Sequence, residues 1–259
     1  TLAEFNTINA TGGALAGNVN VNGVNDAALL TALQNTAADL GDVSAVNSGL
    51  LHGGAILKSS LDNQAAGELR TTSSDWVRFE GIGNINSGEI NNFGGQVDFA
   101  QDLTNDPDGA INNFGGLLVV GGTANNMSNG FIGGRGQFIA DGAWNNSGVM
   151  FFTGTTDVLG DVANEAGGQI VTSGFTTTTF YDDLVHNGAE IRTSAGSATV
   201  IGDGATGAGA YTGTGTVYFE GDLRPGNSPG AVSFGGDVVL GSSSTTQIEL
   251  AGTTAGAYD

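Results

Sequence analysis

The 259-residue chain has no cysteine and only three prolines. Without cysteine it can form no disulfide, no thiolate zinc site and no thiol nucleophile. Basic residues are also scarce, because six Lys and Arg stand against 26 Asp and Glu and give a formal net charge of −20. Such a surface repels nucleic acid and anionic membranes, and we expect neither as a partner. No stretch approaches the roughly 18 apolar residues of a membrane-spanning helix, so we expect no membrane insertion.

Charged residues make up only 12% of the chain, whereas glycine contributes 46 residues. This composition is unusual for a globular enzyme and is typical of elongated all-β proteins. The chain opens with Thr instead of Met and shows no basic segment followed by an apolar stretch, so we interpret it as a processed or partial product. An acidic, Lys-poor chain rich in Asn, Gly and Thr indicates an extracellular protein of the bacterial cell surface.

One phrase recurs through the chain: an Asn, a Gly a few residues later, and then an apolar residue. The glycines of this phrase are Gly88, Gly109, Gly130, Gly148, Gly167 and Gly188. They are separated by 21, 21, 18, 19 and 21 residues, and the hexapeptide Ile-Asn-Asn-Phe-Gly-Gly occurs at both 90–95 and 111–116. A fixed period near 20 residues predicts a solenoid.

The content of the repeat selects the type of solenoid. The units consist of Gly, Asn, Thr and short apolar alternations, which favour strands over helices or leucine-rich repeats. Three short strands with tight corners use about 20 residues and advance the axis by about 4.8 Å. We therefore predict an all-β fold, a right-handed parallel β-helix of about 20 residues per coil.

The repeat also predicts stacked columns of side chains. We expect one buried apolar column, formed by Ile90, Ile111, Ile132, Ile170 and Ile191. At the corner before it we expect stacked asparagines, namely Asn86, Asn105, Asn126, Asn146, Asn164 and Asn187. Asn and Gly enter left-handed conformations at low cost, which suits a repeated bend. Phe93 and Phe114 occupy matching positions and are expected to stack inside the rod.

Three zones can be separated along the chain. Residues 1–23 alternate as β segments and are possible donor strands. Residues 24–79 form a helix-containing cap and a transition of short strands, with the helix at 25–41, where Asn25 caps its start and Gly41 ends it. Residues 80–259 are predicted to form the parallel β-helix.

The carboxy-terminal stretch carries a family resemblance. Residues 225–230 read Pro-Gly-Asn-Ser-Pro-Gly, and residues 249–254 read Glu-Leu-Ala-Gly-Thr-Thr, followed by Tyr258-Asp259. Together these elements resemble the closing segment of autotransporter-like passenger β-helices and related large bacterial surface proteins. The resemblance implies a secreted β-helical surface protein and implies no enzymatic activity.

In such proteins the Tyr-Asp pair is followed by further alternating strands, and here a segment of that form lies at the amino terminus. We therefore expect an extracellular structural protein that polymerises with itself, head to tail, by β-strand complementation into a surface or matrix filament. The expected interface joins Phe5, Ile8, Leu15, Val19 and Val21 to Ile248, Leu250 and Tyr258 of a neighbour. The alternatives are a passenger-type adhesin that binds glycans or cells, and a polysaccharide-degrading β-helix.

Acidic residues recur before many corners, and stacked carboxylates could hold calcium between coils. The candidates are Asp106, Asp108, Asp161, Asp183 and Asp203. Capping of the Asp's own turn explains the same pattern and is preferred, so no cofactor is expected. Asp182, Asp183 and His186 are the best catalytic set, yet neighbouring strand positions face opposite sides. We therefore expect no catalytic residue, and we interpret His52 and His186 as surface turn residues.

Overall fold

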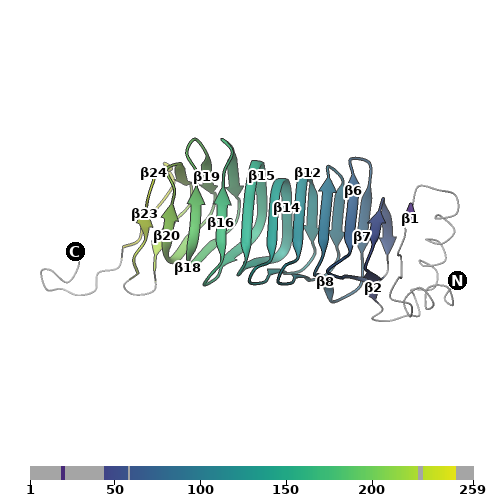
Figure 1. Cartoon of the computed structure of the whole chain (residues 1–259). Coiled ribbons are helices and arrows are strands. Elements are labelled where there is room, and N and C mark those ends of the chain that lie inside the picture. Colours follow the sequence, from purple (N-terminus) through teal and green to yellow (C-terminus); the bar gives the residue numbers. More distant parts are fainter. Residues whose placement is uncertain (1–18, 21–43, 58, 227–229, 249–259) are drawn as a thin grey trace, which may run out of the picture.

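The computed structural model describes residues 19–20, 44–57, 59–226 and 230–248. This part of the chain is all-β: 24 strands, all in parallel pairings, stack as a β-solenoid of about nine coils with about 21 residues per coil. Figure 1 shows the coils stacked side by side into a straight rod. In the described residues no helix is long and apolar enough to cross a membrane. The predicted parallel β-helix is confirmed.

The strands form three ladders that run the length of the rod, which we call faces 1, 2 and 3. Several long strands bend around a corner and belong to more than one face. Face 1 consists of β1 (Val19–Asn20), β3 (Leu50–His52), β6 (Glu68–Thr72), β9 (Glu89–Phe93), β16 (Gln169–Thr172), β23 (Ser233–Phe234) and parts of β12 (Ala110–Val120), β14 (Phe131–Asn146), β15 (Val149–Asn164), β18 (Leu184–Thr193) and β20 (Ala205–Thr212).

The other two faces are built in the same way. Face 2 consists of β4 (Ala55–Leu57), β7 (Trp76–Phe79), β10 (Gln96–Phe99), β17 (Thr177–Phe180), β19 (Ala198–Ile201), β21 (Thr216–Phe219), β24 (Asp237–Leu240) and parts of β12, β14 and β15. Face 3 consists of β2 (Ser44–Asn47), β5 (Ser60–Asn63), β8 (Asn84–Asn86), β11 (Leu103–Asn105), β13 (Ala124–Asn126), β22 (Leu223–Pro225) and parts of β14, β15, β18 and β20.

The solenoid begins earlier than the predicted boundary at residue 80. Strands β2, β3 and β4 pair in register with β5, β6 and β7, so residues 44–79 already form coils. The expected helix at 25–41 and the donor segment at 1–23 lie outside the described residues, apart from Val19 and Asn20.

The core is a set of side-chain columns, because alternate residues of each strand point into the rod. The column predicted on face 1 is confirmed: Ile90, Ile111, Ile132, Ile170 and Ile191 are at most 1% exposed and follow one another in register. Met150 fills the place between Ile132 and Ile170. Burying each of these side chains stabilises the fold by roughly 1.5–3 kcal/mol.

The phenylalanine prediction is half right. The rings of Phe93 and Phe114 do stack, with centroids 4.9 Å apart, but they are 45% and 41% exposed. Each is the outward-facing last residue of its face 1 segment, because the inward places in these coils belong to Asn92 and Asn113. The stack therefore lies on the surface and not inside the rod.

A column of buried asparagines, which we call the asparagine ladder, lines the corner between faces 3 and 1. Each side-chain amide except the last, that of Asn164, donates to the asparagine side-chain oxygen in the next coil at 2.7–2.8 Å. The members are Asn47, Asn63, Asn86, Asn105, Asn126, Asn146 and Asn164. Most of these amides also donate to backbone carbonyls at the corner, which satisfies groups that would otherwise be buried without a partner.

The next place in this asparagine ladder belongs to His186 and not to Asn187. Asn164 pairs with His186 in the strand register, and His186 is 1% exposed whereas Asn187 faces solvent. The prediction for Asn187 is therefore wrong, and so is the interpretation of His186 as a surface residue. A difference of one residue in the corner reverses which side chain points inward.

At Gly88, Gly109, Gly130 and Gly148 the glycine of the repeated phrase is required by a close approach between coils. A Cβ atom on Gly109 would stand 2.3 Å from the carbonyl oxygen of Asn86 in the preceding coil. The left-handed residue lies one position earlier, at Asp108 (φ 70°) and Asn129 (φ 69°). The expectation that the Asn and Gly of the phrase supply the left-handed conformation is therefore wrong at these two corners, whereas it holds at Gly167, whose φ is 89°.

Candidate functional site

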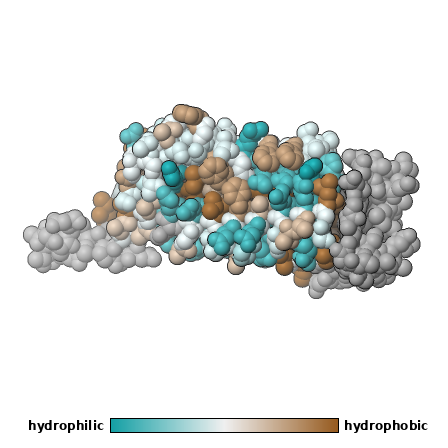
Figure 2. Space-filling view, in the orientation of Figure 1, coloured by the Kyte–Doolittle hydropathy of each residue, from teal (hydrophilic) through white to brown (hydrophobic). Residues whose placement is uncertain are grey.

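The last described coil presents core positions to solvent. Val238 and Leu240 of β24 are in register with Val217 and Phe219, which are 4% and 1% exposed. Val238 itself is 37% exposed and Leu240 is 50% exposed. On face 1, Phe234 follows buried Tyr211 and is 37% exposed. Figure 2 shows hydrophobic residues at this end of the rod.

The strands of this coil also have open backbone edges. Among the described residues, β24 pairs only with β21, and β23 pairs only with β20. On face 3 the chain makes one further step, where Leu223 bridges to Thr246. We call Ser233–Phe234 and Asp237–Leu240 together the terminal coil. An edge of this kind is a template for pairing with another strand.

The expected donor segment is described only at its end. Val19 and Asn20 form β1, which pairs in parallel with Leu51 and His52 of the same chain. These two residues therefore occupy a place on their own first coil. Of the other expected interface residues, Ile248 is 74% exposed, whereas Phe5, Ile8, Leu15, Val21, Leu250 and Tyr258 lie outside the described residues.

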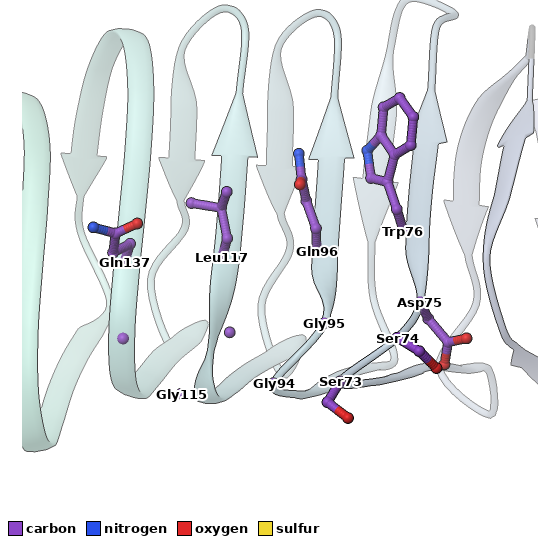
Figure 3. Close-up of a pocket in the computed structure, with 12 residues that line it drawn as sticks. Ser73, Ser74, Asp75, Trp76, Gly94, Gly95, Gln96, Gly115, Leu117 and Gln137 are labelled. Atoms are coloured by element: carbon purple, nitrogen blue, oxygen red, sulfur yellow. The ribbon is translucent and has the colours of Figure 1, made fainter.

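A second surface feature is a groove along the corner between faces 1 and 2. It encloses about 440 Å³, and its floor consists of glycines from successive corners, Gly94, Gly95, Gly115, Gly116 and Gly136. Trp76, Gln96, Leu117 and Gln137 are in register on four successive coils. Figure 3 shows their side chains in a row above the glycine corners. We call this feature the corner groove.

Two of the five acidic residues considered for calcium, Asp161 and Asp183, bond to backbone N–H groups. Asp161 Oδ1 accepts the Asp183 N–H at 3.3 Å, and Asp183 Oδ1 accepts the Gly204 N–H at 3.0 Å. Asp106 accepts a hydrogen bond from Ser87, while Asp108 and Asp203 are exposed. No group of three or more acidic or His side chains that could hold a metal ion occurs in the described part of the chain. Asp161 and Asp183 thus cap the corner of the next coil, where we expected each to cap its own.

The candidate catalytic residues do not form a common site. The Asp182 carboxylate accepts the N–H of Gly160 in the preceding coil at 2.7 Å, whereas the Asp183 carboxylate accepts the N–H of Gly204 in the following coil. His186 points into the core, where its Nε2 lies 3.3 Å from the Ala210 carbonyl oxygen. His52 is partly exposed, with its Nε2 3.9 Å from Asp75 Oδ2.

Sequence reasoning missed both the terminal coil's exposed core positions and the corner groove. The repeated Phe-Gly-Gly followed by Gln96 or Leu117 marks the groove's corner in two coils, but only the register aligns Trp76 and Gln137 with them.

Comparison with protein-family models, with curated proteins and with solved structures finds no match for this chain.

Proposed function

We propose that this protein is an extracellular structural rod that assembles head to tail, with the terminal coil of one copy receiving a strand from the next. The observation that carries the proposal is the exposure of Phe234, Val238 and Leu240 at positions that are buried in the preceding coil. The occupant is the amino-terminal segment of a second copy, residues 1–18, which contains Phe5, Ile8 and Leu15.

The pairing of β1 with β3 defines which part of the segment is donated. Val19 and Asn20 remain on their own first coil, so the donated strand comes from the residues before them. An extended chain spans up to about 3.3 Å per residue, which gives 18 residues ample reach to a copy stacked on the same axis. The first coil thereby anchors the segment that links the two rods.

Complementation would stabilise the junction in two ways. Covering the exposed parts of Phe234, Val238 and Leu240 contributes about 1 kcal/mol for each side chain, since each is already partly buried. Each backbone hydrogen bond to the open edges of β23 and β24 adds about 0.5–1.5 kcal/mol. Because no cysteine is present, no disulfide bond joins the copies.

Deletion of residues 1–18 tests the proposal, because it removes the donor and leaves β1 in place. We expect filaments of the full chain in electron microscopy and a monomeric truncated chain in sedimentation velocity. A peptide of residues 1–18, added in excess, should shorten the filaments of the full chain. A truncated chain that still forms filaments would refute strand donation.

The acceptor side has a matched set of variants on one strand. Leu240→Asp and Val238→Asp place a charge at core positions of β24, so both should abolish assembly. Val239→Asp changes a residue of the same strand that faces outward and is 40% exposed, so it should leave assembly intact. Equal loss in all three variants, or a monomeric full chain at every concentration, would favour the passenger-adhesin alternative.

A further inference from the structure

We propose that the corner groove binds an unbranched, neutral polysaccharide, which lies along the rod axis. Trp76 would stack on a sugar ring, and the side-chain amides of Gln96 and Gln137 would hydrogen-bond to hydroxyl groups. This surface lies on the flank of the rod, away from the terminal coil, and the inference does not depend on assembly.

The groove combines the two kinds of surface that a sugar requires. A sugar ring presents C–H groups on its faces and hydroxyl groups around its edge, so it binds to aromatic planes flanked by donors and acceptors. Trp76 is 44% exposed, and Figure 3 shows its indole at one end of the row that contains both glutamines. A concave surface with an aromatic wall and a few polar groups is typical of ligand sites.

The glutamine amides are available for a ligand. In the described part of the chain, no hydrogen bond from the side chain of Gln96 or Gln137 to another protein group is present. Other amides on the outer surface are engaged, since Asn112 donates to Asn91 at 2.9 Å and Asn145 donates to Asn125 at 2.9 Å. The structure therefore uses surface Asn to join coils but leaves the two Gln of the groove free.

The shape of the groove indicates an extended chain. Trp76, Gln96, Leu117 and Gln137 project from successive coils, so the row repeats at about 4.8 Å along the axis. The floor is open because Gly94 and Gly115 carry no side chain, and their positive φ angles, 86° and 100°, disfavour other residues at these places. A polymer can therefore lie across several coils without bending.

Charge favours a neutral polymer. The net charge of −20 repels polyanions, and Asp75 lies in the lining of the groove. Arg135 is nearby, because its Nε would be 3.5 Å from a Cβ atom on Gly115. A single guanidinium can donate to a hydroxyl group but does not offset the acidic surface. The same reasoning disfavours nucleic acid and acidic polysaccharides.

Binding can be measured with an array of neutral hexasaccharides that contains glucose, mannose, galactose, xylose and N-acetylglucosamine polymers, together with polygalacturonate fragments. The chain has two tryptophans, and Trp144 is 1% exposed, so a ligand-induced change in fluorescence would report on Trp76. Isothermal titration calorimetry gives the affinity independently. Using the Leu240→Asp variant as the parent protein separates the result from filament formation.

We expect at least one neutral hexasaccharide to bind, and Trp76→Ala to weaken it at least tenfold and to remove the fluorescence change. Gln96→Ala and Gln137→Ala should each weaken binding about two- to tenfold, as for one lost hydrogen bond. Tyr181→Ala is the control, because Tyr181 is an aromatic residue with 50% exposure that lies between β17 and β18, at the corner between faces 2 and 3 and not at the corner of the groove, and it should not alter binding.

Three results would overturn the proposal. They are no binding of any neutral hexasaccharide at millimolar concentration, equal weakening by Tyr181→Ala, and tighter binding of polygalacturonate than of every neutral probe. Thermal melts of each variant, compared with the parent protein, identify loss of affinity that comes from unfolding. Because Trp76, Gln96 and Gln137 are solvent-accessible, we expect their substitutions to change the melting temperature little.

Discussion

His186 is an ionisable residue at the end of a buried column of amides. Its ring packs edge-on against Tyr211, with centroids 5.2 Å apart, and lies where a Cβ atom on Gly209 would stand. Its Nδ1 has no hydrogen-bond partner in the structure. Burial lowers the pKa of His186 and raises the pKa of Tyr211, so both side chains favour their neutral forms.

The lowered pKa of His186 predicts a loss of stability in acid. Protonation is easier in the unfolded chain, where the pKa is about 6.5, so stability is fully present above that pH and declines as the pH falls below it. Denaturant unfolding between pH 7.5 and 5 should show this decline in the wild type. His186→Asn should reduce the slope, because an asparagine in this place cannot titrate.

Protonation of Asp and Glu side chains changes the stability of both the wild type and His186→Asn as the pH falls. The contribution of His186 is therefore the difference between the two curves of unfolding free energy against pH. Identical slopes would show that the ring of His186 is hydrated or protonated in the folded state.

At the scale of one corner, the asparagine ladder decides how consecutive coils join. Asn126 accepts from Asn105 at 2.8 Å, donates to Asn146 at 2.8 Å and donates to the carbonyl oxygens of Gly130 and Val149 at 3.2 Å. Each of these coils thus contributes one Asn side chain, which hydrogen-bonds to backbone carbonyls at its own corner and in the next coil. The ladder is continuous only because every member points inward.

Asn126→Ala should destabilise the protein by at least about 1–3 kcal/mol, because it leaves buried donors and acceptors without partners. Asn187→Ala should change stability by less than about 0.5 kcal/mol, since the Asn187 side chain is exposed and, among the described residues, bonds only to the Glu165 carboxylate at 3.1 Å. Chemical denaturation measures both values. Hydrogen exchange should show the loss of protection centred on β13 and β14, and equal effects of the two substitutions would contradict the inward ladder.

At the scale of the whole molecule, charge opposes the proposed stacking of rods. Each copy carries a formal net charge of −20, and the Debye length is about 30 Å at 0.01 M salt but about 8 Å at 0.15 M. The junction itself depends on apolar and backbone contacts, which salt does not weaken. We therefore expect assembly to be faster and filaments to be longer at 0.15 M than at 0.01 M salt.

Light scattering at the two salt concentrations tests this expectation, with Leu240→Asp as the control that should stay monomeric in both. Slower assembly at the higher concentration would mean that attraction between opposite charges, and not strand complementation, holds the junction.

The sequence by itself determined the period, the strand content and the face 1 column. Regular steps between Gly88, Gly109 and Gly130, with an apolar residue after each, require one buried position per coil. The sequence did not reveal the coils of residues 44–79, because the ladder members Asn47, Asn63 and Asn86 are unevenly spaced and the repeated phrase is incomplete in that region.

The tertiary structure alone decided which of two adjacent residues beside a corner points its side chain into the rod. His186 replaced Asn187 in the ladder, and Phe93 and Phe114 lie outside the rod, because strand side chains alternate and one residue more or less at a corner reverses them. The terminal coil and the corner groove likewise depend on register between coils, since the side chains that form them are far apart in the sequence. Local composition predicts that a coil forms, whereas the stacking of coils determines which surface each coil presents.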